Sequence, residues 1–253
     1  CFSGCFQFCT APGNRTRASV HEEQAGDNMT MEANVALVYG SFFMGDCVRD
    51  INIIKDAFPG ISGLRTAAPV NGNSFKFSSL KSCKFLIICT SSQYSMPPPN
   101  FKEFAHQLLL ASSNPGCLSH LQHAIYGNGD ETYWKTYMNM PRYMDRLLER
   151  CGSRRFFARG ETGEPFAPLD LIRCNIQEWA PAMWSAAAQA VQEGPAAPHV
   201  AWDALWAKDA GENHHDVVEW DLKALIEVHG ELKAKPSIFS KSHQLDFMPS
   251  LGA

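Results

Sequence analysis

Short, largely apolar runs alternate with helical stripes of apolar residues between residues 34 and 190 of this chain. The clearest run is Phe85 to Cys89, and Asn34 to Tyr39 and Leu121 to Tyr126 are of the same kind. Runs that are apolar at nearly every position are typical of strands buried on both faces, as in parallel sheets. The stripes between them have the period of an amphipathic helix. The alternation predicts an α/β fold in which helices cover both faces of a parallel sheet.

The remaining elements are predicted from weaker signals. Leu64 to Val70 and Arg155 to Ala158 are expected as strands, the first of them at an edge because Pro69 cannot donate to a ladder. Helices are expected at residues 47–58, 101–109, 140–151 and 169–184, the last with a bend at Pro181. Pro59-Gly60 and Gly152 are the signals that end the first and third of these helices.

The composition changes on either side of this region. We expect an N-terminal extension at residues 1–33, a domain at residues 34–190, and a C-terminal extension at residues 191–253 with one helix. The first methionine is Met29. This start is typical of a chain trimmed after import into an organelle, either chloroplast or mitochondrion, or of a shortened chain; otherwise the cytoplasm is expected.

Charge and cysteine content exclude some classes of function. The net charge of −4 and the isoelectric point near 6.1 give no basic face for a nucleic acid. No run approaches the roughly 18–20 apolar residues of a membrane-spanning helix, so no transmembrane segment is expected. Most of the nine cysteines stand singly among apolar neighbours and are expected to be buried free thiols. Cys1, Cys5 and Cys9 lack a recognised zinc spacing, although a thiol or metal protein that uses them remains an alternative.

A glycine turn follows the strand predicted at Leu121 to Tyr126. Its sequence is Gly127-Asn128-Gly129-Asp130, and the aromatic pair Tyr133-Trp134 comes soon afterwards. Glycines at the carboxyl end of a strand let the backbone approach a ligand closely, and an aromatic ring offers a flat face for stacking. This arrangement is typical of planar cofactor sites in open α/β sheets. Packing of both aromatic rings on the neighbouring helix is the alternative.

Five segments in the same order give the chain a family resemblance. They are Val38-Tyr39-Gly40-Ser41, Pro97-Pro98 with residues 100–104, Ala124 to Asp130, residues 147–155, and the tryptophan pair Trp179 and Trp184. Over about residues 34–190 the chain resembles the flavodoxin-like domains, nearest to the FMN-binding half of diflavin reductases. The resemblance implies a doubly wound five-stranded sheet of order 2-1-3-4-5, with FMN at the carboxyl ends of the strands.

The resemblance also assigns candidate FMN contacts, and it shows where the sequence departs from the family pattern. In the first loop Ser41 and Gly45 remain, but the hydroxyl residues that would hold a phosphate are replaced by Phe, Met and Asp46. In the second loop no glycine remains, and Ser92 and Tyr94 are the candidates. The third loop matches, with Gly127, Asn128, Gly129 and Asp130 near the ring and Tyr133 or Trp134 stacked on it. Glu161 or Glu164 would fill the acidic position after the fifth strand.

Two functions follow from this pattern. The first is a flavodoxin-like accessory or structural subunit of an organellar electron-transfer assembly, photosynthetic or respiratory, in which the FMN site is weakened or lost. Its partner would be a larger membrane-associated complex. The alternative is a working FMN-binding one-electron carrier or reductase module. In neither case does the resemblance imply a catalytic acid, base or nucleophile, since the flavin itself carries the chemistry.

Overall fold

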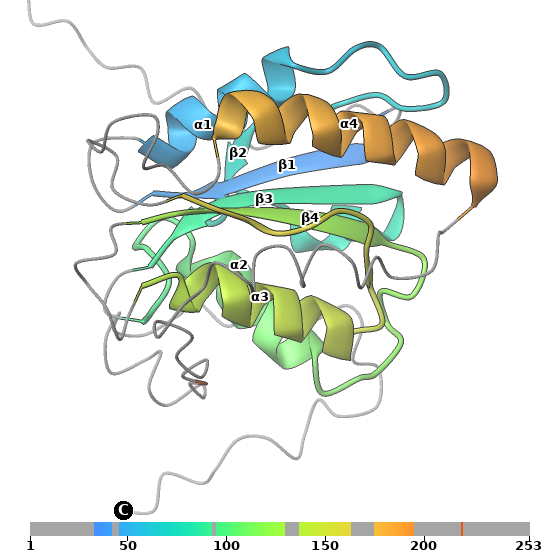
Figure 1. The fold of residues 1–253 in the computed structure, drawn as a ribbon. Helices are drawn as coiled ribbons and strands as arrows, with labels where there is room; N and C mark the ends of the chain where they lie inside the picture. Colours follow the sequence, from blue (N-terminus) through green and yellow to red (C-terminus); the bar gives the residue numbers. More distant parts are fainter. Residues whose placement is uncertain are drawn as a thin grey trace, which may run out of the picture.

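A parallel sheet lies between two layers of helices (Figure 1). The computed structural model describes residues 33–41, 46–92, 95–129, 137–162, 175–194 and Glu219. The strands are β1 Val35–Gly40, β2 Val70–Asn71, β3 Phe85–Ser91, β4 Gln122–Asn128, β5 Arg154–Arg155 and β6 Gly160–Glu161. The helices are α1 Asp46–Asp56, α2 Lys102–Ala111, α3 Asn139–Arg150 and α4 Ile176–Glu193, with a short 3₁₀ turn, η1, at Phe77–Lys81.

The strand order is β2-β1-β3-β4-β5, and every pairing is parallel. This confirms the predicted order. The three central strands are buried along almost their whole length, as their apolar sequences require. Both faces are covered: α1 and α4 lie on one face, and α2 and α3 lie on the other (Figure 1).

Each face has its own apolar core. The tryptophans of α4 close the first core: Trp184 packs edge-on against Phe58, and its indole N–H donates to the Ile54 carbonyl oxygen at 2.7 Å. On the other face, Phe101 and Phe104 at the start of α2 pack with Met144 and Leu147 of α3. The two cores together fix the helices against the sheet, and so fix where the helix N-termini meet the strand ends.

The second and fifth strands differ from the prediction. Only Val70–Asn71 pairs with β1 as a strand, preceded by a single bridge from Thr66 to Val35. Pro69 has no N–H to donate and interrupts the ladder between them. The strand expected at Arg155 to Ala158 is instead two short pieces, β5 and β6, which pair with opposite ends of β4. Between them the Ala158 carbonyl accepts the Trp179 indole N–H at 3.0 Å, which takes this carbonyl out of the ladder.

The last helix begins later than its apolar stripe suggested. α4 starts at Ile176, where the side chain of Asn175 accepts the Gln177 backbone N–H at 2.9 Å and caps the helix. The earlier stripe residues Leu169 and Ile172 lie outside the described residues. α4 continues to Glu193, three residues past the expected end of the domain, and accommodates Pro181 within its length.

Candidate functional site

The carboxyl ends of the strands lie side by side at one edge of the sheet. Gly40 of β1 is in register with Thr90 of β3, Thr90 with Gly127 of β4, and Gly127 with Glu161 of β6. The sheet therefore brings together five of the predicted contacts, which are Ser41, Ser92, Gly127, Asn128 and Gly129. The other five, which are Gly45, Tyr94, Asp130, Tyr133 and Trp134, lie outside the described residues.

The N-terminus of α1 carries acidic groups. Asp46 is the first residue of the helix, and one of its carboxylate oxygens lies 3.5 Å from a guanidinium nitrogen of Arg49. One turn further on, the buried side chain of Asp50 accepts two hydrogen bonds from Arg49, both at 3.1 Å. Burial raises the pKa of Asp50, although Asn128 and Arg49 act in the opposite direction. A helix N-terminus normally attracts an anion, but here the chain supplies its own carboxylates.

The side chain of Asn128 is already hydrogen-bonded to Asp50, one of the two acidic residues of α1. Its side-chain amide donates to the second carboxylate oxygen of Asp50 at 2.7 Å, and both side chains are buried. The predicted cofactor contact of the third loop therefore joins β4 to α1. The Ser41 backbone N–H likewise donates inside the protein, to the side-chain oxygen of Asn100 at 3.0 Å.

The second loop holds the N-terminus of α3. The Ser92 hydroxyl accepts the Met140 backbone N–H at 2.8 Å, and the Asn139 side-chain amide donates to the Ser95 carbonyl oxygen at 2.9 Å. The residue before α3, Met138, makes no capping hydrogen bond through its own side chain. Ser92 therefore replaces the missing cap from a distant part of the chain. Ser95 has φ of 70°, a conformation that glycine adopts more readily than serine.

Gly127 and Gly129 are close to side chains at the start of α3. A Cβ at Gly127 would lie 2.5 Å from the Met138 sulfur and 2.8 Å from Pro141 Cγ. At Gly129 the nearest atom would be the Met138 terminal methyl, at 3.3 Å. Tight packing against α3 is thus a sufficient reason for glycine at position 127.

A buried network of charges lies beside this edge, and sequence reasoning missed it. The Asp145 carboxylate on α3 accepts from His123 Nε2 at 2.9 Å and from Arg155 Nε at 3.0 Å, and it also pairs with Arg159. Glu161 accepts from Arg159 Nε at 2.7 Å and from Arg142 Nε at 2.8 Å. The sequence signal was available as Arg155 and Arg159 in and around the last strand segment, but Asp145, the carboxylate that both of them contact, comes from α3.

The network shifts the acidities of both carboxyl groups. Burial would raise the pKa of Asp145, but the His123 hydrogen bond and the charges of Arg159 and Arg155 hold it well below its usual range. Burial would likewise raise the pKa of Glu161, whereas Arg142 and Arg159 lower it to about 2. Glu161 was one of two candidates for the acidic position that the family resemblance implies after the fifth strand. It is paired with two guanidinium groups, which offset its charge. The other candidate, Glu164, lies outside the described residues.

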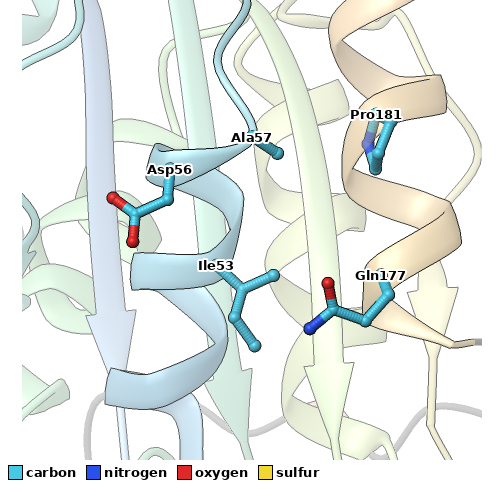
Figure 2. A pocket seen from close by; sticks show the side chains of 5 residues that line it. All are labelled: Ile53, Asp56, Ala57, Gln177 and Pro181. Atoms are coloured by element: carbon cyan, nitrogen blue, oxygen red, sulfur yellow. The ribbon is translucent and has the colours of Figure 1, made fainter.

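The described part of the chain contains no cluster of three metal-ligating side chains, and none of its helices has the length and hydropathy needed to span a bilayer. A shallow hollow of about 300 Å³ lies between α1 and α4, where Ile53 and Gln177 point toward one another (Figure 2). It is formed by the last turn of α1, away from the acidic N-terminus of that helix. Cys1, Cys5 and Cys9 lie outside the described residues.

The chain is similar in sequence to known proteins. The flavodoxin family profile matches residues 60–174, a range that begins after α1. The chain is 34% identical over 131 residues to a bifunctional cytochrome P450/NADPH--P450 reductase of Bacillus subtilis, covering 51% of this chain and 12% of that protein. A protein of the same description from Gibberella moniliformis is 25% identical over 173 residues, which are 65% of this chain and 15% of the relative.

A solved structure shows the same fold. The flavodoxin of Streptococcus pneumonia TIGR4 superposes with a TM-score of 0.50 at 15% identity, covering 61% of this chain and 97% of that one. The chain therefore matches nearly a whole single-domain protein in structure, but only a small part of each multidomain relative in sequence.

Proposed function

Residues 60–174 match the flavodoxin family profile, and from this similarity we propose that the chain serves an electron-transfer system with a weakened FMN site. The family resemblance makes FMN the cofactor to consider. The observation that carries the proposal is the Asp46 carboxylate in the first turn of α1, where the family resemblance would place a phosphate. The described residues there do not fit a phosphate dianion, because a second carboxylate, that of Asp50, lies one turn further on and a single guanidinium, that of Arg49, is paired with both.

Three other observations support the proposal. The Ser92 hydroxyl and the Asn128 amide are already used inside the protein, in α3 capping and in the bond to Asp50. A flavin would have to compete for these groups. The family match begins only after α1, so the segment that would hold a phosphate is the one that has diverged.

Titration of the full chain with FMN and with riboflavin tests whether phosphate binding at the N-terminus of α1 is weakened. Riboflavin lacks the phosphate, so a repelled phosphate predicts that the wild-type chain binds FMN no more tightly than riboflavin. Asp46→Thr should raise the FMN affinity by about tenfold or more, equivalent to about 1.4 kcal/mol, and leave riboflavin binding unchanged. Asp56→Asn, at the other end of α1, is the matched control and should change neither affinity.

A strong preference of the wild-type chain for FMN, unchanged by Asp46→Thr, would contradict the proposal. It would favour the second candidate function, a working FMN-binding one-electron carrier or reductase module. The similarity to two reductase fusions is the observation that favours this candidate. In that case the residues outside the described part would supply contacts that compensate for Asp46.

The finer proposal is that the domain acts as an accessory subunit of a larger electron-transfer assembly, photosynthetic or respiratory, in an organelle. A flavodoxin-like domain that no longer binds its cofactor cannot carry electrons itself. It can still bind the redox proteins with which flavodoxin-like domains interact. Native gel fractionation of membranes from the source organism, probed with an antibody to this chain, tests it. Comigration with a large complex is expected. A signal confined to the monomer position in every fraction would overturn this part of the proposal.

A further inference from the structure

Two cysteines from different elements meet at the edge of the sheet opposite the strand carboxyl ends. Cys117 lies in the turn after α2, and Cys151 directly follows α3. The backbone N–H of Leu118 donates to the Cys151 carbonyl oxygen at 2.8 Å. At the neighbouring position, a Cβ on Gly152 would lie only 2.8 Å from Gly116 Cα. The two segments are thus in direct backbone contact, which places the two cysteines close together, as a disulfide requires.

The two thiols differ in exposure and in acidity. Cys117 is half-buried, Cys151 is fully buried, and the Cys151 thiol hydrogen-bonds to the Cys117 sulfur. This hydrogen bond lowers the pKa of the Cys117 thiol, and the same contact together with burial raises the pKa of Cys151. Cys117 is therefore the thiol that reaches solvent and ionises more readily. Cys151 is held behind it, in reach of its sulfur.

We propose that Cys117 and Cys151 form a reversible disulfide by exchange with small-molecule disulfides. In the first step the Cys117 thiolate attacks one sulfur of the small disulfide, forms a mixed disulfide and releases one small thiolate. The Cys151 sulfur then attacks the Cys117 sulfur, forms the internal disulfide and releases the second small thiolate. The two protons of the protein thiols end on the released thiols, so the chain loses two hydrogens and the small disulfide is reduced.

A second thiol pair in the same structure provides an internal comparison. Cys47 of α1 and Cys89 of β3 also contact one another, but both are fully buried in the core between the sheet and α1. Burial is the leading reason that the pKa of Cys89 is well above its usual value. Because neither sulfur reaches solvent, this pair should not react with a small disulfide while the protein is folded. Reaction at one pair and not at the other is thus the signature of the proposal.

The test uses the full, reduced and folded chain with an excess of oxidised glutathione, followed by mass spectrometry of intact protein and of peptides without reduction. A cross-linked peptide pair that contains Cys117 and Cys151 is expected, while Cys47 and Cys89 remain alkylatable after denaturation. Dithiothreitol should reverse the link. Closing the link encloses β4 and α3, so it should also raise the melting temperature.

Two variants make the outcome unambiguous. Cys151→Ser should stop the reaction at a stable glutathione adduct on Cys117, and Cys117→Ser should abolish both the link and the adduct at this place. Cys83→Ser, a single buried cysteine on the same side of the sheet, is the control and should leave the link unchanged. An adduct that persists on wild-type Cys117 without closure, or a link that forms only in denaturant, would overturn the proposal. None of these results depends on flavin binding.

Discussion

Packing within the protein explains why particular residue types occupy the strand ends, and Gly127 is the clearest example. Gly127→Ala places a Cβ against the Met138 sulfur and the rigid ring of Pro141. We expect a loss of about 1–3 kcal/mol in the free energy of unfolding, the usual effect of overpacking. Urea unfolding of the FMN-free chain measures it. Gly129→Ala is the control and should cost less, because its nearest neighbour is the end of a flexible side chain. Equal losses at both positions would contradict the packing explanation.

Glu161 makes a pH-dependent contribution to stability. Its pKa is about 2 in the folded protein against an ordinary value of 4.5, so the contribution is complete above pH 4.5 and is lost as the pH falls toward 2. The shift corresponds to about 3 kcal/mol. Glu161→Gln should therefore lower the free energy of unfolding at pH 7, and its difference from wild type should shrink on acidification.

Unfolding curves of both proteins between pH 7 and pH 2.5 test this expectation. Glu149→Gln serves as the control at pH 7, because the exposed Glu149 pairs with Arg155 at the surface and should contribute less than about 1 kcal/mol. A difference between wild type and Glu161→Gln that stays constant with pH would show that the ion pairs do not set the acidity of Glu161.

At the scale of elements, α3 depends on a cap that comes from another loop. Ser92→Ala removes the acceptor of the Met140 N–H and should reduce the free energy of unfolding by about 0.5–2 kcal/mol. Chemical denaturation with far-ultraviolet circular dichroism measures it. Ser185→Ala is the matched control: its hydroxyl bonds the Pro181 carbonyl on the exposed side of α4, so its removal should change stability by less than about 0.5 kcal/mol. No loss at Ser92 would mean that water satisfies this N–H equally well.

The elements predicted correctly from the sequence are those that a single local pattern marks. The central strands and α1 to α3 agree within a few residues, because each is marked by apolar periodicity and a nearby terminator. The fifth strand lies in the predicted place but is shorter than predicted, because the Ala158 carbonyl bonds the indole N–H of Trp179, which lies more than twenty residues away. The candidate site was harder for the same reason. Asn128 bonds Asp50 of α1, and both Ser92 and Glu161 bond residues of α3, and no spacing in the sequence records these contacts.

For the whole molecule, the apolar face of α4 sets the smallest chain that can fold. Trp179, Met183 and Trp184 are buried against α1 and the sheet, whereas the one described residue beyond Gly194 is Glu219, which makes exposed ion pairs with Arg146 and Arg150. Glu219→Gln should therefore change the free energy of unfolding by less than about 1 kcal/mol. A chain that ends at residue 174 should show no cooperative unfolding. Thermal and urea unfolding of the Glu219→Gln variant and of this truncation check both expectations, and a cooperative transition in the truncated chain would contradict the role given to α4.

The short outer strands have a consequence for solubility. β2 and β5, which end the strand order, are two residues long each. A strand from another molecule would find few unpaired backbone N–H and C=O groups to pair with at these edges. In addition, β5 consists of two arginines, Arg154 and Arg155. The longer, apolar strands β1, β3 and β4 lie between these edges, so the described sheet offers little exposed strand edge on which amyloid-like growth could begin.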